Sequence, residues 1–505
     1  MNSKNTLLLS CGFLSGGCCL SGEKVVNEKV PNIILILADD LGYGDISAFN
    51  ENSKIKTTHI DILCENGIKF TDAHSCSAVS TPSRYGMLTG RYAFRTTLKE
   101  GVLGGFSAPL IPKDRNTMAS MLSKQGYNTA CIGKWHLGWN WAYNEKKEVD
   151  YTKPITEGPV TRGFDYFYGI SASLDMSPYV YIENDKVTAL PNRIAQEFQG
   201  LLLQREGPQG ADFEHEDCLP NFFGRAINYI EDQKKTDKPF FLYLPITAPH
   251  TPILPTADYQ GKSGLSPYGD FVLMIDDMIG NIISTLKETG FYDNTIIILT
   301  SDNGCAPYAD MKGMEEKGHY PSYAFRGAKS DLYDGGHRIP LIISWGNKFE
   351  NQVENGIISL TDFYATFAEM TGYEMPDNEG EDSFSFWPLL SKKGVSQRKD
   401  LIHHSVEGNF AIRNDKWKLL FCAGSGGWSY PRKSDKIISE LPAIQLYNLK
   451  EDIGEKDNLN NNYSEIVEKL TTTMREYILN GRSTPGKKQA NDTDNNWEQT
   501  LLFMK

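Results

Sequence analysis

The sequence predicts an α/β fold, in which a mixed, mostly parallel sheet lies between helices, followed by a smaller C-terminal α+β domain with an antiparallel sheet. Residues 32–38 and 295–300 are continuous apolar runs rich in β-branched side chains, a pattern typical of strands covered on both faces. Beyond about residue 391 the pattern changes to short strands separated by turns, which favours the second sheet. We therefore expect a large domain at residues 30–390 and a smaller one at residues 391–505.

The composition limits the kinds of partner. The chain of 505 residues has 51 basic and 64 acidic side chains and a net charge of −13. This balance argues against nucleic acid as a partner. It also provides no long-range attraction for an anion, so a site for an anionic substrate requires a local pocket of lysine and arginine.

Residues 1–22 are typical of an export leader, with Lys4 ahead of a short apolar core at residues 7–9. The segment is too short to span a bilayer as a folded helix, and we expect a protein of the periplasm or the cell surface. Lipidation of Cys18 or Cys19 is an alternative that the preceding residues fit poorly, and the protein would be membrane-bound only through such a lipid. The six cysteines after the leader show no metal-ligand spacing.

Oxygen ligands follow both apolar runs. Asp39 and Asp40 come directly after the first run, and Asp302 and Asn303 follow the second. Because open α/β sheets place their sites at the carboxyl ends of the strands, we expect these side chains to converge. Three carboxylates and an amide oxygen suit Ca²⁺, with Mg²⁺ as an alternative, and the lack of a histidine or cysteine cluster argues against zinc. A lone acidic pair after a strand is more often a helix cap or a solvated turn.

Residues 80–91 predict a short helix, because Pro82 and Ser83 suit its first turn and Gly90 suits its end. Ser80 would then lie just ahead of the helix N-terminus. The free amides and the helix dipole favour an anionic group there by roughly 0.3–1 kcal/mol. The alternative is an ordinary capped helix without a ligand.

Basic side chains follow two further predicted strands. Residues 128–132 predict one short strand, the apolar run at residues 240–244 predicts the other, and a loop follows each. Taken singly, a histidine after a strand is more often structural and a lone lysine is usually solvated, but their joint occurrence favours a site. The candidates are Lys134 and His136 after the first strand, His250 after the second, and Lys329 further along the chain.

The remaining segments complete the two predicted domains. Residues 356–373 carry apolar side chains at roughly helical spacing, which predicts a core helix. Residues 410–421 predict a β-hairpin and residues 444–448 a further strand. Residues 464–480 have one apolar face and predict a helix that packs on this small sheet.

The run at residues 80–91, in which Ser80 precedes Pro-Ser-Arg and a later Leu-Thr-Gly-Arg, resembles the signature of the type I sulfatases of the alkaline-phosphatase superfamily. Residues 133–138, 247–252 and 326–340 resemble further motifs of this family, in the family's order. The resemblance extends from about Pro31 through Pro340. It implies a large alkaline-phosphatase-like domain that carries a smaller antiparallel one, and it implies hydrolysis of sulfate monoesters.

The resemblance also implies a cofactor at the head of the motif. In type I sulfatases this residue is oxidised after synthesis to formylglycine, the catalytic nucleophile, so Ser80 would be converted here. A serine at this position requires a maturase of the type that oxidises serine. The family's calcium site would be formed by Asp39, Asp40, Asp302 and Asn303, with residue 80 completing it.

The family's catalytic roles follow the same motifs. The sulfuryl oxygens would be bound by Arg84, Lys134 and Lys329. Asp302 would take a proton from the nucleophile, and His250, with Lys329, would protonate the leaving sugar oxygen. His136 would assist the release of sulfate, which requires the second hydroxyl of the hydrated aldehyde. An unconverted Ser80 lacks that hydroxyl and would be unable to turn over by this route.

Two stretches bear on the substrate. Residues 173–179 and 318–323 look like those of sulfatases that act on galactose or N-acetylgalactosamine, and they make Asp175 and His319 candidate substrate contacts. The chain as a whole resembles bacterial exo-acting carbohydrate sulfatases and the group of arylsulfatase A and N-acetylgalactosamine-6-sulfatase. We therefore expect removal of 6-O- or 4-O-sulfate from sulfated glycans such as glycosaminoglycans and mucins. Asp334 and His337 lie where relatives vary and receive no role.

Two other functions remain open at this point. A phosphatase or phosphodiesterase of the same superfamily typically binds two zinc ions through several histidines, a pattern that this chain lacks. A catalytically inactive protein could bind sulfated glycans with an unmodified Ser80. The mass of the peptide that contains Ser80 distinguishes the inactive protein from the enzyme.

Overall fold

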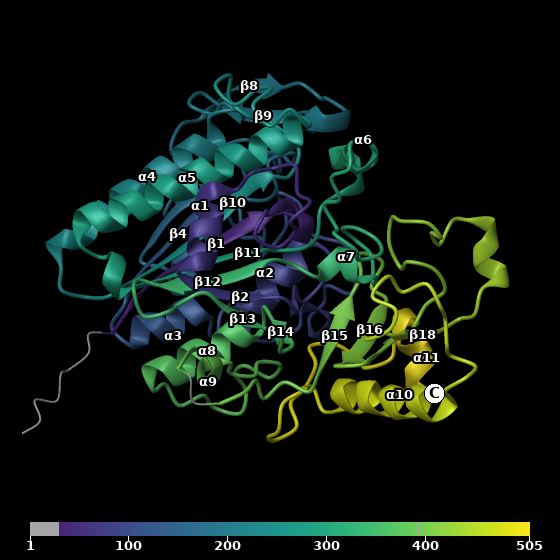
Figure 1. Ribbon diagram of the computed structural model, residues 1–505. Coiled ribbons are helices and arrows are strands. Elements are labelled where there is room, and N and C mark those ends of the chain that lie inside the picture. The colour runs from purple at the N-terminus through teal and green to yellow at the C-terminus, as the bar shows by residue number, and fades with distance from the viewer. Residues whose placement is uncertain (1–29, 392–393) are drawn as a thin grey trace, which may run out of the picture.

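The computed structural model describes residues 30–391 and 394–505 (Figure 1), so the predicted leader at residues 1–22 lies outside the described residues. The largest sheet in the described part of the chain has ten strands. In spatial order these are β13 (Gln352–Glu354), β2 (Gly67–Phe70), β12 (Leu341–Trp345), β11 (Thr295–Ser301), β1 (Asn32–Asp39), β10 (Phe240–Pro249), β4 (Asn128–Lys134), β5 (Tyr166–Ile170), β6 (Ile182–Glu183) and β7 (Lys186–Val187).

The centre of this sheet is parallel. Strands β11, β1, β10, β4 and β5 run in one direction, with Ile33 opposite Phe241 on one side and Ile296 on the other. On one side β12 is antiparallel to β11 and β2 is antiparallel to β12, and on the other side β6 is antiparallel to β5. The predicted mixed, mostly parallel sheet is thus confirmed, and the carboxyl ends of its central strands lie at one edge.

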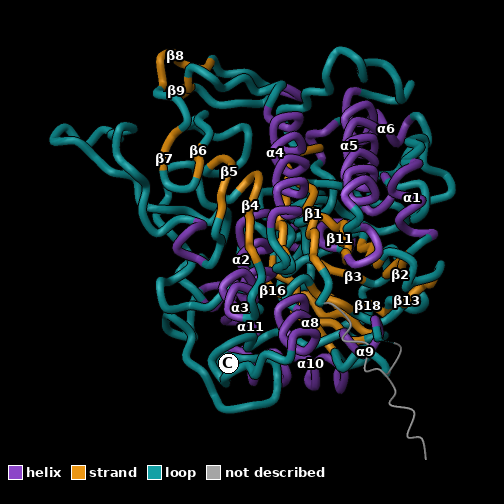
Figure 2. The backbone as a smooth tube through the Cα atoms, turned by 90° about the vertical axis from the view of Figure 1, so that its left-hand side faces the viewer, coloured by secondary structure: helices purple, strands orange, loops and turns teal. Residues whose placement is uncertain are grey.

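Helices cover both faces of the sheet (Figure 1). One face carries α1 (Thr58–Glu65), α4 (Cys218–Asp232) and α5 (Pro267–Thr289), and the other carries α2 (Ser80–Thr89), α3 (Met118–Lys124) and α8 (Asp362–Thr371). Helices α4 and α5 pack side by side, as Figure 2 shows from a second direction. Along β1, Ile33 and Leu35 belong to one core and Ile34 and Ile36 to the other. A strand with a core on both faces needs an uninterrupted apolar run, which explains the sequence pattern.

The C-terminal part forms a separate antiparallel sheet in the order β15 (Asp400–His404), β16 (Phe410–Asn414), β17 (Trp417–Leu420) and β18 (Gln445–Asn448). Helix α10 (Ser464–Leu479) packs on it through Leu470, Met474 and Ile478 (Figure 1). The predicted hairpin, strand and helix are present. Strand β15 was not predicted, because its sequence ends in two histidines, His403 and His404, that are buried rather than exposed.

The predicted helix at residues 356–373 is shorter in the structure. It begins at Asp362, while Ile358 and Ser359 form β14 (Ile358–Ser359), which pairs with β3 (Ala73–His74). The carboxylate of Asp362 accepts a hydrogen bond from the Ser359 amide at 2.9 Å, which fixes the turn between strand and helix. Ile358 is therefore buried in a strand, although its spacing also fits a helix face.

The other elements are short. They are β8 (Pro191–Ala195), β9 (Gly207–Gly210), α6 (Met311–Glu316), α7 (Asp334–His337), α9 (Trp387–Leu390) and α11 (Leu501–Met504). In the described part of the chain all six cysteines are buried and unpaired, and none of its helices has the length and apolarity needed to cross a membrane.

Candidate functional site

The predicted site residues meet at the carboxyl edge of the central strands. Asp39 ends β1, and Lys134 ends β4. Asp302 follows β11 and His250 follows β10. Strand β1 lies between β10 and β11, so the parallel arrangement brings together side chains from four distant parts of the sequence.

Ser80 lies at the start of α2, as its first residue rather than just ahead of it, and Val79 before it is extended. The Ser80 hydroxyl donates to Asp39 Oδ1 at 3.2 Å, and Lys134 Nζ lies 3.2 Å from Ser80 Oγ. The helix ends at Gly90, whose φ of 65° is left-handed and easily adopted by glycine. The predicted end of the helix is therefore confirmed.

Three buried cations pair with three buried carboxylates. Lys134 Nζ donates to Asp39 Oδ2 at 2.7 Å, and Lys329 Nζ donates to Asp40 at 2.8 Å. The Arg84 guanidinium donates to Asp302 Oδ2 through Nε at 3.1 Å and Nη2 at 2.8 Å. All six side chains are buried, so the formal charges of the three pairs cancel in a region that excludes water.

The pKa values of Asp39 and Lys329 reflect this pairing, whereas at Lys134 burial outweighs Asp39 and lowers the pKa of the ammonium. Burial alone would raise the pKa of Asp39, but Lys134 and the neighbouring cations outweigh it and hold this pKa well below its usual range. Burial acts against the ammonium of Lys329, yet Asp40 raises its pKa well above the ordinary value. Asp39 and Lys329 are therefore charged at neutral pH.

The oxygen atoms at this edge fit a hard cation. Asn303 Nδ2 donates to Asp40 Oδ1 at 2.6 Å, whereas Asn303 Oδ1 is buried and has no hydrogen-bond partner among the described residues. Buried polar atoms are rarely left unpaired, and a cation would satisfy this oxygen. Ligand atoms of Asp39, Asp40 and His250 also lie within 4.8 Å of one another. A set of ligand atoms that consists mostly of oxygen suits Ca²⁺ better than zinc.

The two histidines present different ring atoms to the site. His136 Nε2 lies 2.7 Å from the Leu103 carbonyl oxygen, so Nε2 carries the proton, while Nδ1 is buried without a partner among the described residues. Burial and then Lys134 lower the pKa of His136 well below its usual value. His136 is therefore a neutral ring whose Nδ1 has a free lone pair. His250 differs, because its Nδ1 faces the Thr251 carbonyl and its Nε2 lies 3.7 Å from Asp40.

Three of the nine described non-glycine residues with left-handed backbone lie at this edge. Asp40, His136 and Ser330 all have left-handed φ angles, of 67°, 57° and 85°. Such a conformation costs about 1–3 kcal/mol for a residue other than glycine and persists only when the surrounding structure holds it. Two of the three are predicted site residues, and the third follows Lys329 directly.

A pocket of about 200 Å³ opens above Ser80 and includes His136, His250 and Lys329 in its wall. Asp175, a predicted substrate contact, also lines it. Asp175 Oδ2 pairs with Arg205, while Oδ1 is buried and has no partner among the described residues. An unpaired acceptor in a pocket wall is available to a hydroxyl of a ligand.

His319 does not belong to this pocket. Its side chain is fully buried, Nε2 pairs with Asp45 Oδ1 at 2.9 Å, and Nδ1 accepts from the Lys54 amide at 3.2 Å. Because both ring nitrogens are engaged inside the protein, the structure does not support the expected contact between His319 and substrate.

Four residues that sequence reasoning missed also line the pocket: Ser173, Arg205, Tyr308 and Trp428. Ser173 Oγ lies 3.3 Å from Lys134 Nζ, and the Tyr308 hydroxyl lies 3.1 Å from Lys329 Nζ. Ser173 and Tyr308 could have been found, since each lies within or near a stretch already considered. Trp428 comes from a Gly/Ser-rich loop of the C-terminal part, which gave no sequence signal for this site.

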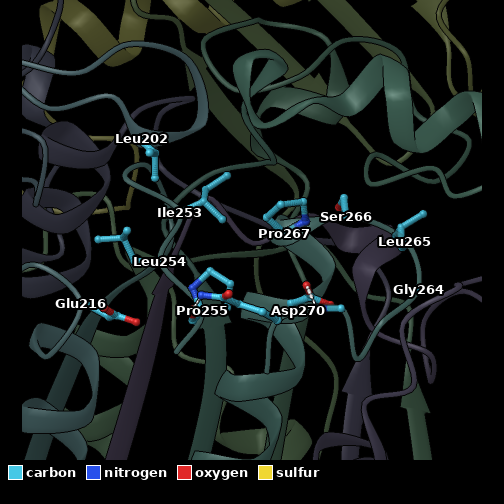
Figure 3. Close-up of a pocket in the computed structure, with 12 residues that line it drawn as sticks. Leu202, Glu216, Ile253, Leu254, Pro255, Gly264, Leu265, Ser266, Pro267 and Asp270 are labelled. Carbon is cyan, nitrogen blue, oxygen red and sulfur yellow. Dashed lines mark hydrogen bonds between the residues drawn. The ribbon is translucent and has the colours of Figure 1, made fainter. Parts of the chain in front are cut away.

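A larger hollow of about 570 Å³ lies next to this pocket. Leu202 lines the larger hollow, and the next residue, Leu203, lines the pocket above Ser80. Figure 3 shows that Ile253 and Pro267 surround it together with the carboxylates of Glu216 and Asp270. None of the described residues that line it is lysine, arginine or histidine. It therefore lacks the charge to bind a sulfate.

A second histidine cluster lies where α7 meets β15. His74, Asp334, His337 and His403 hold possible ligand atoms within 4.8 Å of one another. However, Lys418 Nζ lies 2.7 Å from Asp334 Oδ1 and 3.2 Å from His337 Nε2. Because an ammonium already occupies the position of a cation, we interpret this cluster as an ion-pair network that joins the two sheets.

The comparisons with known proteins agree with this geometry. The model of the sulfatase family matches residues 31–373. This chain belongs to the sulfatase family. Members of this family are sulfuric ester hydrolases of the alkaline-phosphatase-like superfamily and generally use formylglycine and Ca²⁺.

Relatives match over most of this sulfatase. It is 33% identical over 485 residues to N-acetylgalactosamine-6-O-sulfatase of Bacteroides thetaiotaomicron, which covers 89% of this chain and 93% of the relative. It is 31% identical over 455 residues to human arylsulfatase A, covering 85% and 83%. A solved structure concerned with metabolism of multiple glycosaminoglycans by Bacteroides thetaiotaomicron superposes with a TM-score of 0.77 at 31% identity, covering 88% and 98%.

Proposed function

We propose that this sulfatase removes 6-O- or 4-O-sulfate from galactose or N-acetylgalactosamine of sulfated glycans, with formylglycine formed from Ser80 and with Ca²⁺. The observation that carries the proposal is the position of Ser80, whose hydroxyl lies 3.2 Å from both Asp39 Oδ1 and Lys134 Nζ at the base of a pocket. The named relative that acts on N-acetylgalactosamine 6-sulfate supports the choice of sugar.

Asp39, Asp40, Asp302 and Asn303 would hold the calcium ion. When bound, Ca²⁺ supplies a Lewis acid that stabilises negative charge on oxygen. The charges of the three carboxylates and the three basic side chains cancel, so a bound divalent cation would make the site net positive. A net positive site suits an anionic sulfate ester.

The cationic side chains would bind the sulfuryl group. Lys329 lines the pocket and is hydrogen-bonded to Asp40, whereas Lys134 is hydrogen-bonded to Asp39 and lies behind the pocket, with its Nζ 3.2 Å from Ser80 Oγ. Arg84 is held by two hydrogen bonds to Asp302 and a third to the Lys134 carbonyl oxygen. Donors that are fixed before the reaction stabilise developing charge without reorganisation.

The histidines would move protons at the two ends of the reaction. His250 lines the pocket, and its Nε2 faces the Asp40 carboxylate and the Tyr308 hydroxyl. This ring can donate a proton to the leaving sugar oxygen, with Lys329 beside it. His136 Nδ1 has a free lone pair, so His136 can accept the proton that is lost when sulfate is released.

The proposal extends to maturation and location. Ser80 requires a maturase that oxidises serine, and the leader at residues 1–22 would direct the protein to the periplasm or the cell surface. Within this plan residues 30–390 form the catalytic domain and residues 391–505 the smaller one.

A panel of 2-, 3-, 4- and 6-sulfated monosaccharides, assayed by sulfate release, tests the substrate. We expect release from the 6- or 4-sulfate of N-acetylgalactosamine or galactose, and little from the 2- and 3-sulfates. Release only from another position or sugar would contradict the substrate assignment. Binding without release, together with an unmodified Ser80, would support the inactive glycan-binding protein instead.

A further inference from the structure

The loop between β17 and β18 reaches the catalytic pocket, although it belongs to the C-terminal sheet. Trp428 in this loop lines the pocket and keeps 40% of its surface exposed. Val406, from the loop that follows β15, lines the same pocket. The wall of the pocket is therefore completed by residues that are remote from all the predicted catalytic motifs.

The loop is held firmly in place. The Trp428 amide donates to Ser330 Oγ at 2.8 Å, and the Ser429 amide donates to Asp331 Oδ1 at 3.1 Å. At Gly427 a Cβ atom would lie 2.4 Å from the Ser330 carbonyl oxygen, so only glycine allows this close approach. An exposed indole on a fixed backbone loses little conformational entropy when a ligand binds.

Trp428 lies close to the groups proposed to act on the leaving sugar. Its ring centroid is 5.8 Å from that of Tyr308, at an interplanar angle of 47°. The Tyr308 hydroxyl in turn lies 3.1 Å from Lys329 Nζ and 3.4 Å from His250 Nε2. The indole therefore extends the wall formed by Lys329, His250 and Tyr308.

We propose that Trp428 is a specificity-determining residue, whose indole is the platform for the pyranose ring that carries the sulfate. This inference rests on the proposed function. Galactose and N-acetylgalactosamine have an axial 4-hydroxyl, which leaves one face of the ring composed largely of C–H groups. Such a face packs on an indole, while polar groups elsewhere in the lining, such as Asp175, fix the orientation of the hydroxyls.

Substitution at Trp428 separates binding of the sugar from binding of the sulfate. For Trp428→Ala we expect kcat/KM for N-acetylgalactosamine 6-sulfate to fall about 10- to 100-fold, mainly through KM, because the lost contact is made in both ground and transition states. The inhibition constant of inorganic sulfate should stay within about twofold of wild type. Trp428→Phe, which keeps an aromatic face, should retain most of the activity.

Tyr430 provides the matched control. It is an aromatic residue of the same loop, is 66% exposed and does not line the pocket. Tyr430→Ala should leave KM for the sulfated sugar unchanged. An unchanged KM in Trp428→Ala, or an equal loss in Tyr430→Ala, would overturn the role of Trp428. The role would also be overturned if Trp428→Ala weakened the binding of inorganic sulfate as much as that of the sugar, because this would indicate collapse of the whole pocket.

Calorimetry gives a readout that does not depend on turnover. Wild type and Trp428→Ala are both produced without the maturase, so that Ser80 stays serine and the ligand is not hydrolysed. Titration of N-acetylgalactosamine 6-sulfate into the two proteins should show at least tenfold weaker binding by the variant. Equal affinities of wild type and variant for the sulfated sugar would contradict the role of Trp428 as the platform. Failure of wild type with converted Ser80 to release sulfate from any sugar would instead contradict the proposed function.

Discussion

Lys134 Nζ lies 3.2 Å from Ser80 Oγ and at the same time donates to Asp39 at 2.7 Å. Lys134 ends a central strand and Ser80 begins a helix on one face of the sheet. This single ammonium therefore connects the residue proposed as nucleophile to a carboxylate proposed as calcium ligand.

Lys134→Ala should lower kcat by about a hundredfold or more. Preorganised donors of this kind supply about 2–4 kcal/mol to the transition state. The variant also leaves Asp39 buried without its ammonium, so its thermal stability and metal content must be measured beside the kinetics. Wild-type kinetics in a variant that keeps its calcium would exclude Lys134 from binding the sulfuryl group.

Removal of the metal should abolish turnover and lower the melting temperature, because the carboxylates at this edge would lose the cation that they share. We expect one Ca²⁺ per chain by elemental analysis, and we expect added Ca²⁺ to restore both properties after chelation. Asp302→Ala should lose the metal and the activity together. If that variant keeps the wild-type metal content and rate, the ion lies elsewhere.

His250→Ala should lower the rate on a sulfated sugar roughly 10²–10⁴-fold, the range that a general acid supplies. A nitrophenyl sulfate has a good leaving group that needs little protonation, so its rate should fall much less. A folding defect would lower both rates alike, which makes the second substrate an internal control. Equal losses would leave Lys329 as the remaining candidate for the acid.

His404 should make the stability depend on pH. Burial, with a contribution from the ammonium of Lys99, lowers the pKa of this histidine from 6.5 to about 3. The unfolded chain therefore binds the proton more tightly, so this contribution to stability is complete above about pH 6.5 and is lost as the pH falls towards 3. We expect His404 alone to remove about 2 kcal/mol from the free energy of unfolding between pH 7 and pH 5.

Chemical unfolding of wild type and His404→Phe at the two pH values measures this effect. Phe94 and Phe410 surround the histidine, so a phenylalanine fits the chemistry of the site. The difference in stability between pH 7 and pH 5 should be smaller in the variant by that amount. The same pH dependence in both proteins would show that His404 is not responsible.

Local patterns were sufficient to predict the centre of the fold and most of the candidate site. The continuous apolar run of β1 has a core on both faces, and a parallel sheet then fixes where Asp39 must lie. The left-handed Gly90 ends α2 for a reason that is visible in the sequence. Such features depend on residues that are close together in the chain.

Features that depend on distant contacts could not be predicted in the same way. Ile358 fits a helix face by its spacing, but its pairing with β3 makes it a strand residue. His319 lies in a stretch that resembles substrate-binding segments, and only the fold shows that Asp45 and the Lys54 amide engage its ring. Trp428 reaches the pocket through hydrogen bonds of its loop to Ser330 and Asp331.

The most direct test of this account is the mass of the peptide that contains Ser80, measured in active protein from its native host. Conversion of serine to formylglycine removes two hydrogens, and we expect kcat per chain to rise in proportion to the converted fraction across preparations. Full activity on a sulfated sugar in a preparation in which Ser80 is entirely unmodified would contradict the account.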